Sequence, residues 1–108
     1  MNVENPALIA SMEMLWLREN GTEVSVQVST GLPYEDQGAW ACPAALTGVD
    51  NRYPEVVGSS SRQAIRLAIR LLRQRLGHLL EPGAVLVDLD ERDSRWDIDS
   101  LNAVFGRA

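Results

Sequence analysis

The stretch that decides the fold is SSRQAIRLAIRLLRQRLGHLL, residues 60–80. Ser60 is a good N-cap, and Gln63 completes the pattern of a capping box three residues later. The pair Pro82-Gly83 marks the end of the pattern. Between these limits, apolar residues recur along one side at helical spacing: Ala64, Ile65, Ala68, Ile69, Leu71, Leu72, Leu76 and Leu79. The stretch therefore predicts one long amphipathic helix, with its apolar side laid on a sheet.

A β-hairpin precedes this helix. Apolar residues alternate with other residues over 10–17 and again over 24–29, on either side of Asn20-Gly21. A two-residue loop would pair Leu17 with Val24, whereas a three-residue loop with a left-handed glycine would pair Trp16 with Val24. The second register gathers the larger apolar set on one face, so we expect it.

The remaining segments are shorter. We expect a loose end at 1–7, a loop at 29–39, a short helix at 99–105 and an acidic tail at 91–108. Three more strands are expected at 40–49, 53–57 and 85–89, the first interrupted by Pro43 and the last at an edge. The order is β-β-β-β-α-β, which predicts an α+β fold. A four- to five-stranded antiparallel sheet packs against one long amphipathic helix, with a short C-terminal tail or helix.

Composition describes an ordinary globular protein. The chain has 108 residues, of which 45% are apolar and 23% charged, which suits a single domain over 1–108. No apolar run approaches the ~18 residues of a membrane span, and the first residues lack the basic region of a signal peptide. We therefore expect a cytoplasmic protein with no membrane partner. The formal net charge of −5 disfavours nucleic acid and favours a basic protein partner.

Cofactor and catalytic chemistry have few residues to draw on. Cys42 is the only cysteine and His78 the only histidine, which nearly excludes a conventional zinc site. Cys42 precedes Pro43 in an expected strand, a position typical of a small buried hydrophobe. A catalytic thiolate needs an adjacent base, and His78 lies near the far end of the helix. We expect no catalytic residue, no metal and no cofactor.

Four arginines form a ridge along the predicted helix: Arg62, Arg66, Arg70 and Arg73. Their spacings are those of neighbours on one helix face, and no acid lies between them on that face. One interpretation is a site for an anion, either a phosphate or an acidic partner. The other is a solvated face whose arginines reach carboxylates elsewhere in the chain.

Acidic residues gather in two places. The first is the C-terminal stretch with Asp88, Asp90, Asp93 and Asp97, which surrounds Trp96. It lacks the glycine and the acid spacing of an EF-hand, so we interpret it as an acidic surface with an aromatic anchor for a basic protein. The alternative is a solvated tail whose Trp96 packs on the core. The second place is the loop with Glu35 and Asp36, a further candidate contact for a partner.

Three segments together resemble a family of small bacterial proteins of unknown function. They are Gly31-Leu32-Pro33, then Trp40-Ala41-Cys42-Pro43 followed by Gly48, then residues 58–68. The family pattern is a Trp-x-Cys-Pro strand and a Gly-x-(Asp/Ser)-Ser-x-Gln-Ala helix start, and the resemblance covers residues 9–87. Ser60 stands where an acid is expected. The resemblance implies a bacterial source and a compact α+β domain, and it transfers no catalytic residue.

These observations favour a non-catalytic binding protein, and within that class a bacterial immunity protein that neutralises a toxin. Such a protein is small and acidic and occludes a basic cleft. A second hypothesis is a self-associating structural or regulatory module. The expected hairpin register leaves Leu15 and Leu17 on the outer sheet face, where they could form a homodimer contact beside an open edge strand. A third is a small anionic-ligand binder or enzyme that uses the arginine ridge.

Overall fold

The structure is a computed structural model that describes residues 8–106, so the expected loose end at 1–7 lies outside the described residues. The larger sheet has the order β6-β5-β2-β1-β8, and the smaller sheet has the order β3-β4-β7. The larger sheet is made of β1 (Leu8–Leu17), β2 (Glu23–Gly31), β5 (Ala44–Thr47), β6 (Asn51–Arg52) and β8 (Val85–Asp88). The smaller sheet and the helices are β3 (Tyr34–Asp36), β4 (Ala39–Cys42), β7 (Val56–Gly58), α1 (Ser61–Leu80) and α2 (Ile98–Phe105).

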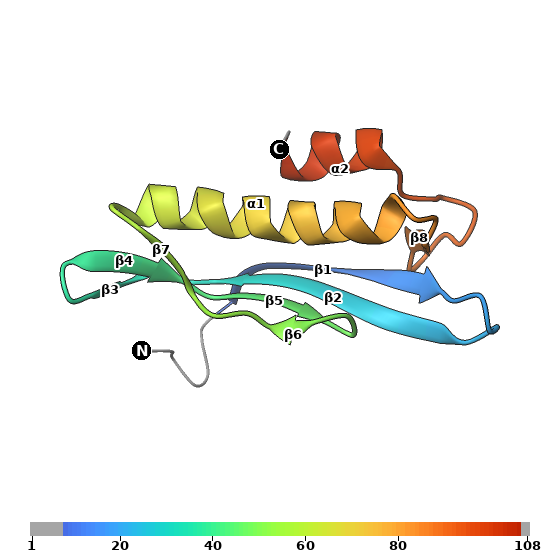
Figure 1. Ribbon diagram of the computed structural model, residues 1–108, viewed down its shortest axis with the longest axis horizontal. Helices are drawn as coiled ribbons and strands as arrows, with labels where there is room; N and C mark the ends of the chain where they lie inside the picture. The colour runs from blue at the N-terminus through green and yellow to red at the C-terminus, as the bar shows by residue number, and fades with distance from the viewer. Residues whose placement is uncertain (1–7, 107–108) are drawn as a thin grey trace.

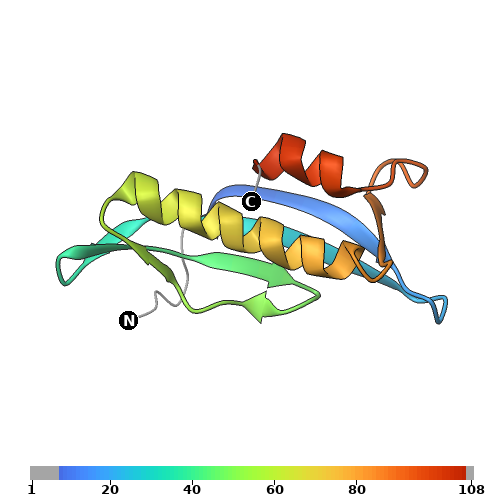
Figure 2. The ribbon, with the colours of Figure 1, turned by 45° about the horizontal axis from the view of Figure 1, so that its top comes forward.

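The fold is α+β, as the sequence predicts, with antiparallel sheets and one long helix packed on them. α1 runs along the long axis of the molecule and contacts strands of both sheets, while α2 lies alongside it (Figures 1 and 2). The β3–β4 hairpin lies at one end of that axis. The β1–β2 turn and the segment that follows β8 lie at the other (Figure 1).

The hairpin register is the one expected. Trp16 pairs with Val24 and Met14 with Val26, so the larger apolar set shares one face. The backbone N–H of Arg18 donates to the carbonyl of Thr22 at 2.9 Å, which closes a three-residue loop. Gly21 within it has φ +85°, the left-handed conformation that such a loop requires.

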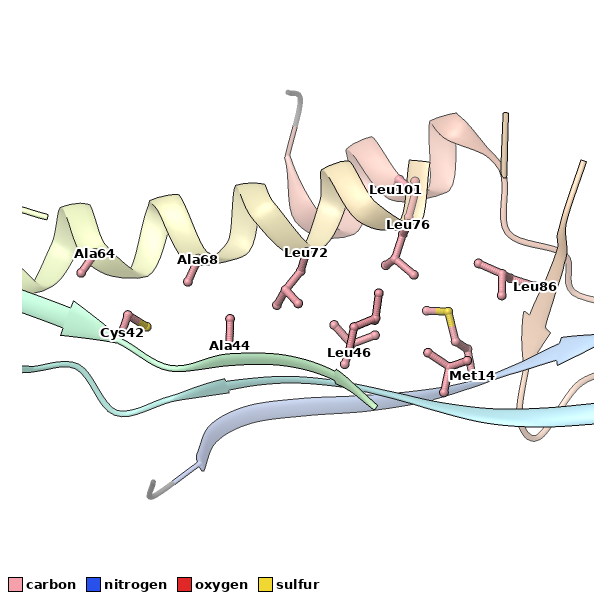
Figure 3. Packing of buried hydrophobic residues seen from close by; sticks show 12 residues of the cluster. Met14, Cys42, Ala44, Leu46, Ala64, Ala68, Leu72, Leu76, Leu86 and Leu101 are labelled. Carbon is pink, nitrogen blue, oxygen red and sulfur yellow. The ribbon is translucent and has the colours of Figure 1, made fainter. Parts of the chain in front are cut away.

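The core lies between α1 and the strands of the two sheets. Met14, Val26 and Val28 face the apolar side of α1, and all are buried. Ala64, Ala68, Leu72 and Leu76 descend from the helix to meet Cys42, Ala44, Leu46 and Met14 in a single layer (Figure 3). The small residues stand at the N-terminal half of α1 and the leucines at its C-terminal half. The predicted hydrophobic interior is therefore present.

The N-terminus of α1 is capped as expected, with one difference. The Ser60 hydroxyl accepts a hydrogen bond from the Gln63 N–H at 3.1 Å. The Gln63 side chain returns to the backbone N–H of Ser59 at 2.6 Å, where a capping box would return to Ser60. Both bonds satisfy N–H groups that the helix itself leaves open.

The strand expected over 40–49 is divided, which the sequence analysis did not predict. β4 belongs to the smaller sheet and β5 to the larger, and Pro43 stands between them. Proline has no N–H to donate, so a continuous ladder is broken there. Gly31 donates to the Pro43 carbonyl at 2.9 Å, and a Cβ on Gly31 would lie 2.8 Å from the proline ring. Position 31 therefore requires a glycine, because a side chain there would collide with the Pro43 ring.

Two other segments differ from expectation. The residues expected as a loop, 29–39, include the end of β2 and all of β3. The strand expected at 53–57 is only partly present. β6 ends at Arg52, before the expected start, and β7 begins at Val56 and ends at Gly58. The short strands β3, β6 and β7 each pair with a strand from another part of the chain or across a turn, and such pairing has no local signal.

The edge of β8 is closed by the chain itself, so it is not the open edge that we expected. After a turn at 89–93 the chain returns, and the N–H of Asp88 donates to the carbonyl of Ser94 at 3.1 Å. The N–H of Trp96 donates to the carbonyl of Leu86 at 2.8 Å. Asp97 then caps α2 and forms a capping box with Ser100. The expected short helix at 99–105 is thus present and starts one residue earlier.

Leu15 is not a free surface residue, which corrects the expected homodimer contact. It lies on the outer face, but its exposed fraction is 7%, and it pairs with the buried Val87 of β8. Arg92, from the segment after β8, forms an ion pair with Glu23 of β2. Because β1 lies between β2 and β8, this ion pair crosses β1 on the face that carries Leu15 and the half-buried Leu17. The outer face therefore holds a small buried cluster of its own.

Candidate functional site

One end of the molecule combines an apolar hollow with exposed carboxylates. The hollow, of about 600 Å³, lies between the β1–β2 turn and the turn that joins α1 to β8. The two turns meet because β8 pairs antiparallel with β1, which places Val85 opposite Leu17. Its apolar lining is made of Trp16, Leu17, Leu79, Pro82, Ala84 and Val85.

Exposed acids lie at the same end of the molecule as this hollow. Glu19 lines it, and Glu81 stands next to Pro82 of its wall. The 89–93 turn lies at the same end of the long axis in both views (Figures 1 and 2) and carries Asp90, Glu91 and Asp93, all exposed. We call the hollow together with Glu19, Glu81, Asp90, Glu91 and Asp93 the acidic end.

Two basic groups at the acidic end, Arg18 and Arg92, have partners. The Arg18 guanidinium lies over the Trp16 ring, 5.0 Å from its centre, in a cation–π contact. Arg92 is held by Glu23, and one of the two contacts measures 2.9 Å. This ion pair keeps the pKa of the Glu23 carboxyl below its ordinary value. It also fixes the 89–93 turn against β2.

The acidic residues singled out from the sequence are not one surface. Asp90 and Asp93 belong to the acidic end, whereas Glu35 and Asp36 lie on β3, at the opposite end of the long axis (Figure 1). Asp88 accepts a hydrogen bond from the Trp96 indole at 2.9 Å. Asp97 is the N-cap of α2, where bonds from Ser100 lower its pKa.

Trp96 packs on the core, in line with the second of the two interpretations given above. It is half-buried against the core cluster, and its ring centre is 6.3 Å from that of Phe105 on α2. Its indole N–H is bound to Asp88. The aromatic residue that lines the acidic end is instead Trp16, which the sequence analysis had assigned to the core alone.

The arginine ridge is divided by the position of α2. Arg66, Arg70 and Arg73 line a second hollow, of about 610 Å³, between α1 and the C-terminal end of α2. Arg62 is exposed on the same helix outside this hollow. We call the hollow and its three arginines the arginine hollow. It lies on the α1–α2 side of the molecule, so it is separate from the acidic end.

Two polar networks that the sequence analysis missed hold the strands in place. The Asp50 carboxylate accepts from Arg75 Nε at 2.7 Å and from the Tyr53 hydroxyl at 2.6 Å, which ties the β5–β6 turn to α1. The Arg75 bond, followed by the Tyr53 bond, lowers the pKa of Asp50. These residues had no sequence signal, because they come together only through the fold.

The second network lies in the smaller sheet. The Glu55 side chain is 3% exposed and bonds to the Tyr34 hydroxyl and to Arg52, at 2.7 Å. The hydrogen bond to Glu55 raises the pKa of Tyr34 to about 12, so the hydroxyl stays protonated at neutral pH. A carboxylate held in this way joins β3 to the chain before β7 and is suited to a structural role.

Nucleophilic chemistry has poor support from the geometry. Cys42 is fully buried, and its thiol donates to the Gly31 carbonyl at 3.5 Å. Burial, followed by the charge of Glu55, raises the pKa of this thiol. His78 is exposed beside Arg75 near the C-terminal end of α1, whereas Cys42 lies in β4, near the N-terminal end of that helix (Figure 3). Within residues 8–106, no three His, Cys, Asp or Glu side chains are grouped as a metal site.

Neither helix in the described part of the chain has the length and apolarity needed to cross a bilayer. Comparison with known proteins finds no matching family model, no similar curated protein and no similar solved structure. The resemblance to small bacterial proteins of unknown function therefore stays a prediction.

Proposed function

We propose that the protein is a non-catalytic binding module that docks a basic protein at its acidic end. Within that class, we propose a bacterial immunity protein that neutralises a toxin. The proposal depends on one observation: an apolar hollow lined by Trp16 and Glu19 lies at the end of the molecule that also carries the exposed acids of the 89–93 turn. Protein interfaces commonly have an apolar centre, often with an aromatic anchor, inside a polar rim.

Charge supports the choice of partner. The net charge is −5, and five exposed acids lie at the same end of the molecule as this hollow, where Arg92 is paired with Glu23. A carboxylate rim attracts a basic surface over a Debye length of about 10 Å and raises the association rate. A toxin that cleaves nucleic acid has a basic cleft of the kind that this rim complements.

The residues that could act chemically support binding over catalysis. Cys42 is buried as a thiol with a raised pKa, and His78 is exposed without a nucleophile beside it. Tyr34 is held protonated by Glu55.

The test uses proteins encoded by the genes adjacent to this one, co-expressed with the chain. We expect one of them to inhibit growth alone, to be tolerated in the presence of this protein, and to bind it with nanomolar-class affinity. The variant combines Asp90→Asn, Glu91→Gln and Asp93→Asn. We expect this variant to bind the partner about 10–100-fold more weakly, mainly because association is slower. The association rate should also no longer depend on salt concentration.

The control combines Glu35→Gln with Asp36→Asn, which removes two charges at the opposite end of the molecule. We expect it to bind as the unmodified protein does. The proposal fails if no adjacent product binds or is neutralised. The proposed docking site at the acidic end is wrong if the control loses as much affinity as the triple variant. That result would indicate that the partner contacts the β3 end.

Self-association is a second candidate, favoured by an unpaired strand edge. β8 pairs only with Met14–Leu17 of β1, so within residues 8–106 no strand covers the other side of 8–13. Leu8 and Ile9 on this segment are 55% and 46% exposed. Light scattering at several concentrations tests it. A dimer that Ile9→Lys dissociates supports this candidate, because an edge lysine opposes strand pairing, and a monomer at every concentration rejects it.

A further inference from the structure

The arginine hollow carries positive charge that no carboxylate within residues 8–106 neutralises. Arg66, Arg70 and Arg73 line it with Gln63, and its lining contains no carboxylate. Other arginines of the chain do reach acids: Arg75 reaches Asp50 and Arg92 reaches Glu23. In the described residues, Arg66 and Arg70 take part in no ion pair. The interpretation of the ridge as arginines that reach carboxylates elsewhere therefore does not describe these two.

Arg73 is positioned by the fold. One of its terminal nitrogens donates to the Asn102 side-chain oxygen on α2 at 2.8 Å, which fixes the guanidinium between the helices. Its Nε is buried and has no hydrogen-bond partner. A buried N–H without an acceptor is uncommon in a folded protein. Partial burial also strengthens the attraction of this cation for an anion, because water screens it less.

The rest of the lining is apolar. Leu67 and Ile69 of α1 and Phe105 of α2 contribute to the walls, and Gly106 lies at the end of α2. Phe105 is supported from behind by Trp96. Arginines on one wall and an aromatic ring on another suit a ligand with an anionic group at one end and an apolar body at the other.

We propose that the arginine hollow binds an oxyanion, a phosphate or a carboxylate, carried on an apolar body. Arg66 and Arg70 are one helical turn apart on one face, so both reach a single anionic group. Arg73 sets how deeply the anionic group enters the hollow, and Phe105 contacts the apolar body. The site is separate from the acidic end, so a ligand here leaves that surface free.

The experiment titrates the full chain with phenyl phosphate, benzoate and inorganic phosphate, each against chloride at matched ionic strength. Binding is followed by NMR through the arginine side chains and the Phe105 ring. We expect saturable shifts with phenyl phosphate or benzoate that persist at ~0.15 M salt, and the tighter of the two identifies the anionic group. Inorganic phosphate should bind more weakly, because it lacks the apolar body.

Matched variants on the same helix locate the site. Arg66→Gln and Arg70→Gln are expected to weaken binding about tenfold each, the loss of one charge-assisted hydrogen-bonding partner. Arg62→Gln removes the same charge outside the hollow and is expected to change affinity by less than about twofold. Both positions at the hollow are exposed, so the fold should persist, and circular dichroism verifies it. The proposal is overturned if no probe gives saturable shifts, or if Arg62→Gln weakens binding as much as Arg70→Gln.

Discussion

Leu76→Ala tests the packing on which every surface described above depends. Leu76 is fully buried and descends from α1 into the layer above Leu46 and Met14 (Figure 3). The substitution removes three carbons from this site, and at about 0.8 kcal/mol per methylene the loss of transfer free energy is about 2.4 kcal/mol. The residues around Leu76 come from the helix and from the strands, so they cannot all move in to fill the cavity. The cavity therefore raises the loss of unfolding free energy to about 3–5 kcal/mol.

Urea unfolding followed by tryptophan fluorescence measures this change. The free energy of unfolding should fall by that amount through a lower midpoint, with the m-value unchanged, because the surface exposed on unfolding is almost the same. Leu89→Ala is the control: Leu89 is 43% exposed, and its loss should stay within about 0.5 kcal/mol. If Leu76→Ala costs less than about 1 kcal/mol, or no more than the control, the interior is not packed as described.

Three further predictions concern single positions. A Cβ on Gly58 would lie 2.8 Å from a backbone nitrogen of α1, so Gly58→Ala should lower the free energy of unfolding by about 1–3 kcal/mol. Gly77→Ala places its Cβ 3.3 Å from a terminal nitrogen of Arg73, so it should cost less than Gly58→Ala; equal effects in urea unfolding would contradict the close approach at Gly58. Arg75 lowers the pKa of Asp50, so the stabilisation is present above about pH 4 and is lost as pH falls through the lower folded-state pKa. In unfolding measured against pH, the difference between the protein and its Asp50→Asn variant, about 1 kcal/mol at pH 7, should shrink as the pH falls below about 4, and a constant difference would refute the linkage. Burial raises the pKa of the Cys42 thiol, so a thiol reagent at pH 8 should label it only after unfolding, and rapid labelling of the folded protein would disprove its burial.

The elements with local signals could be predicted from the sequence. The long helix follows from its cap and its apolar spacing, and the hairpin register follows from the choice that puts Trp16 and Met14 on one face. Both depend on residues close in the chain. The division into two sheets could not be predicted, because it depends on Gly31 meeting Pro43 from another strand. A proline in a strand indicates an interruption, but it does not indicate which strands lie on each side.

The candidate sites were predicted only in part, for the same reason. The arginine ridge is visible in the sequence, but α2 decides that Arg66, Arg70 and Arg73 share a hollow and Arg62 does not. Asp90 and Glu35 are both acidic and exposed, yet the fold places them at opposite ends. Asp97 could have been recognised, since an acid three residues before Ser100 at a helix start is a capping signal.

The interruption at Pro43 has a mechanical consequence. Force applied to the β3–β4 hairpin cannot pass along an unbroken ladder of hydrogen bonds into β5. Apart from the covalent links through residues 32–33 and Pro43, the hairpin is held through β4 and β7 against the first turns of α1, where the side chains that make contact are the small Ala64 and Ala68. The smaller sheet should therefore peel away under tension while the leucine-rich half of the molecule stays intact, giving two steps in a single-molecule extension trace.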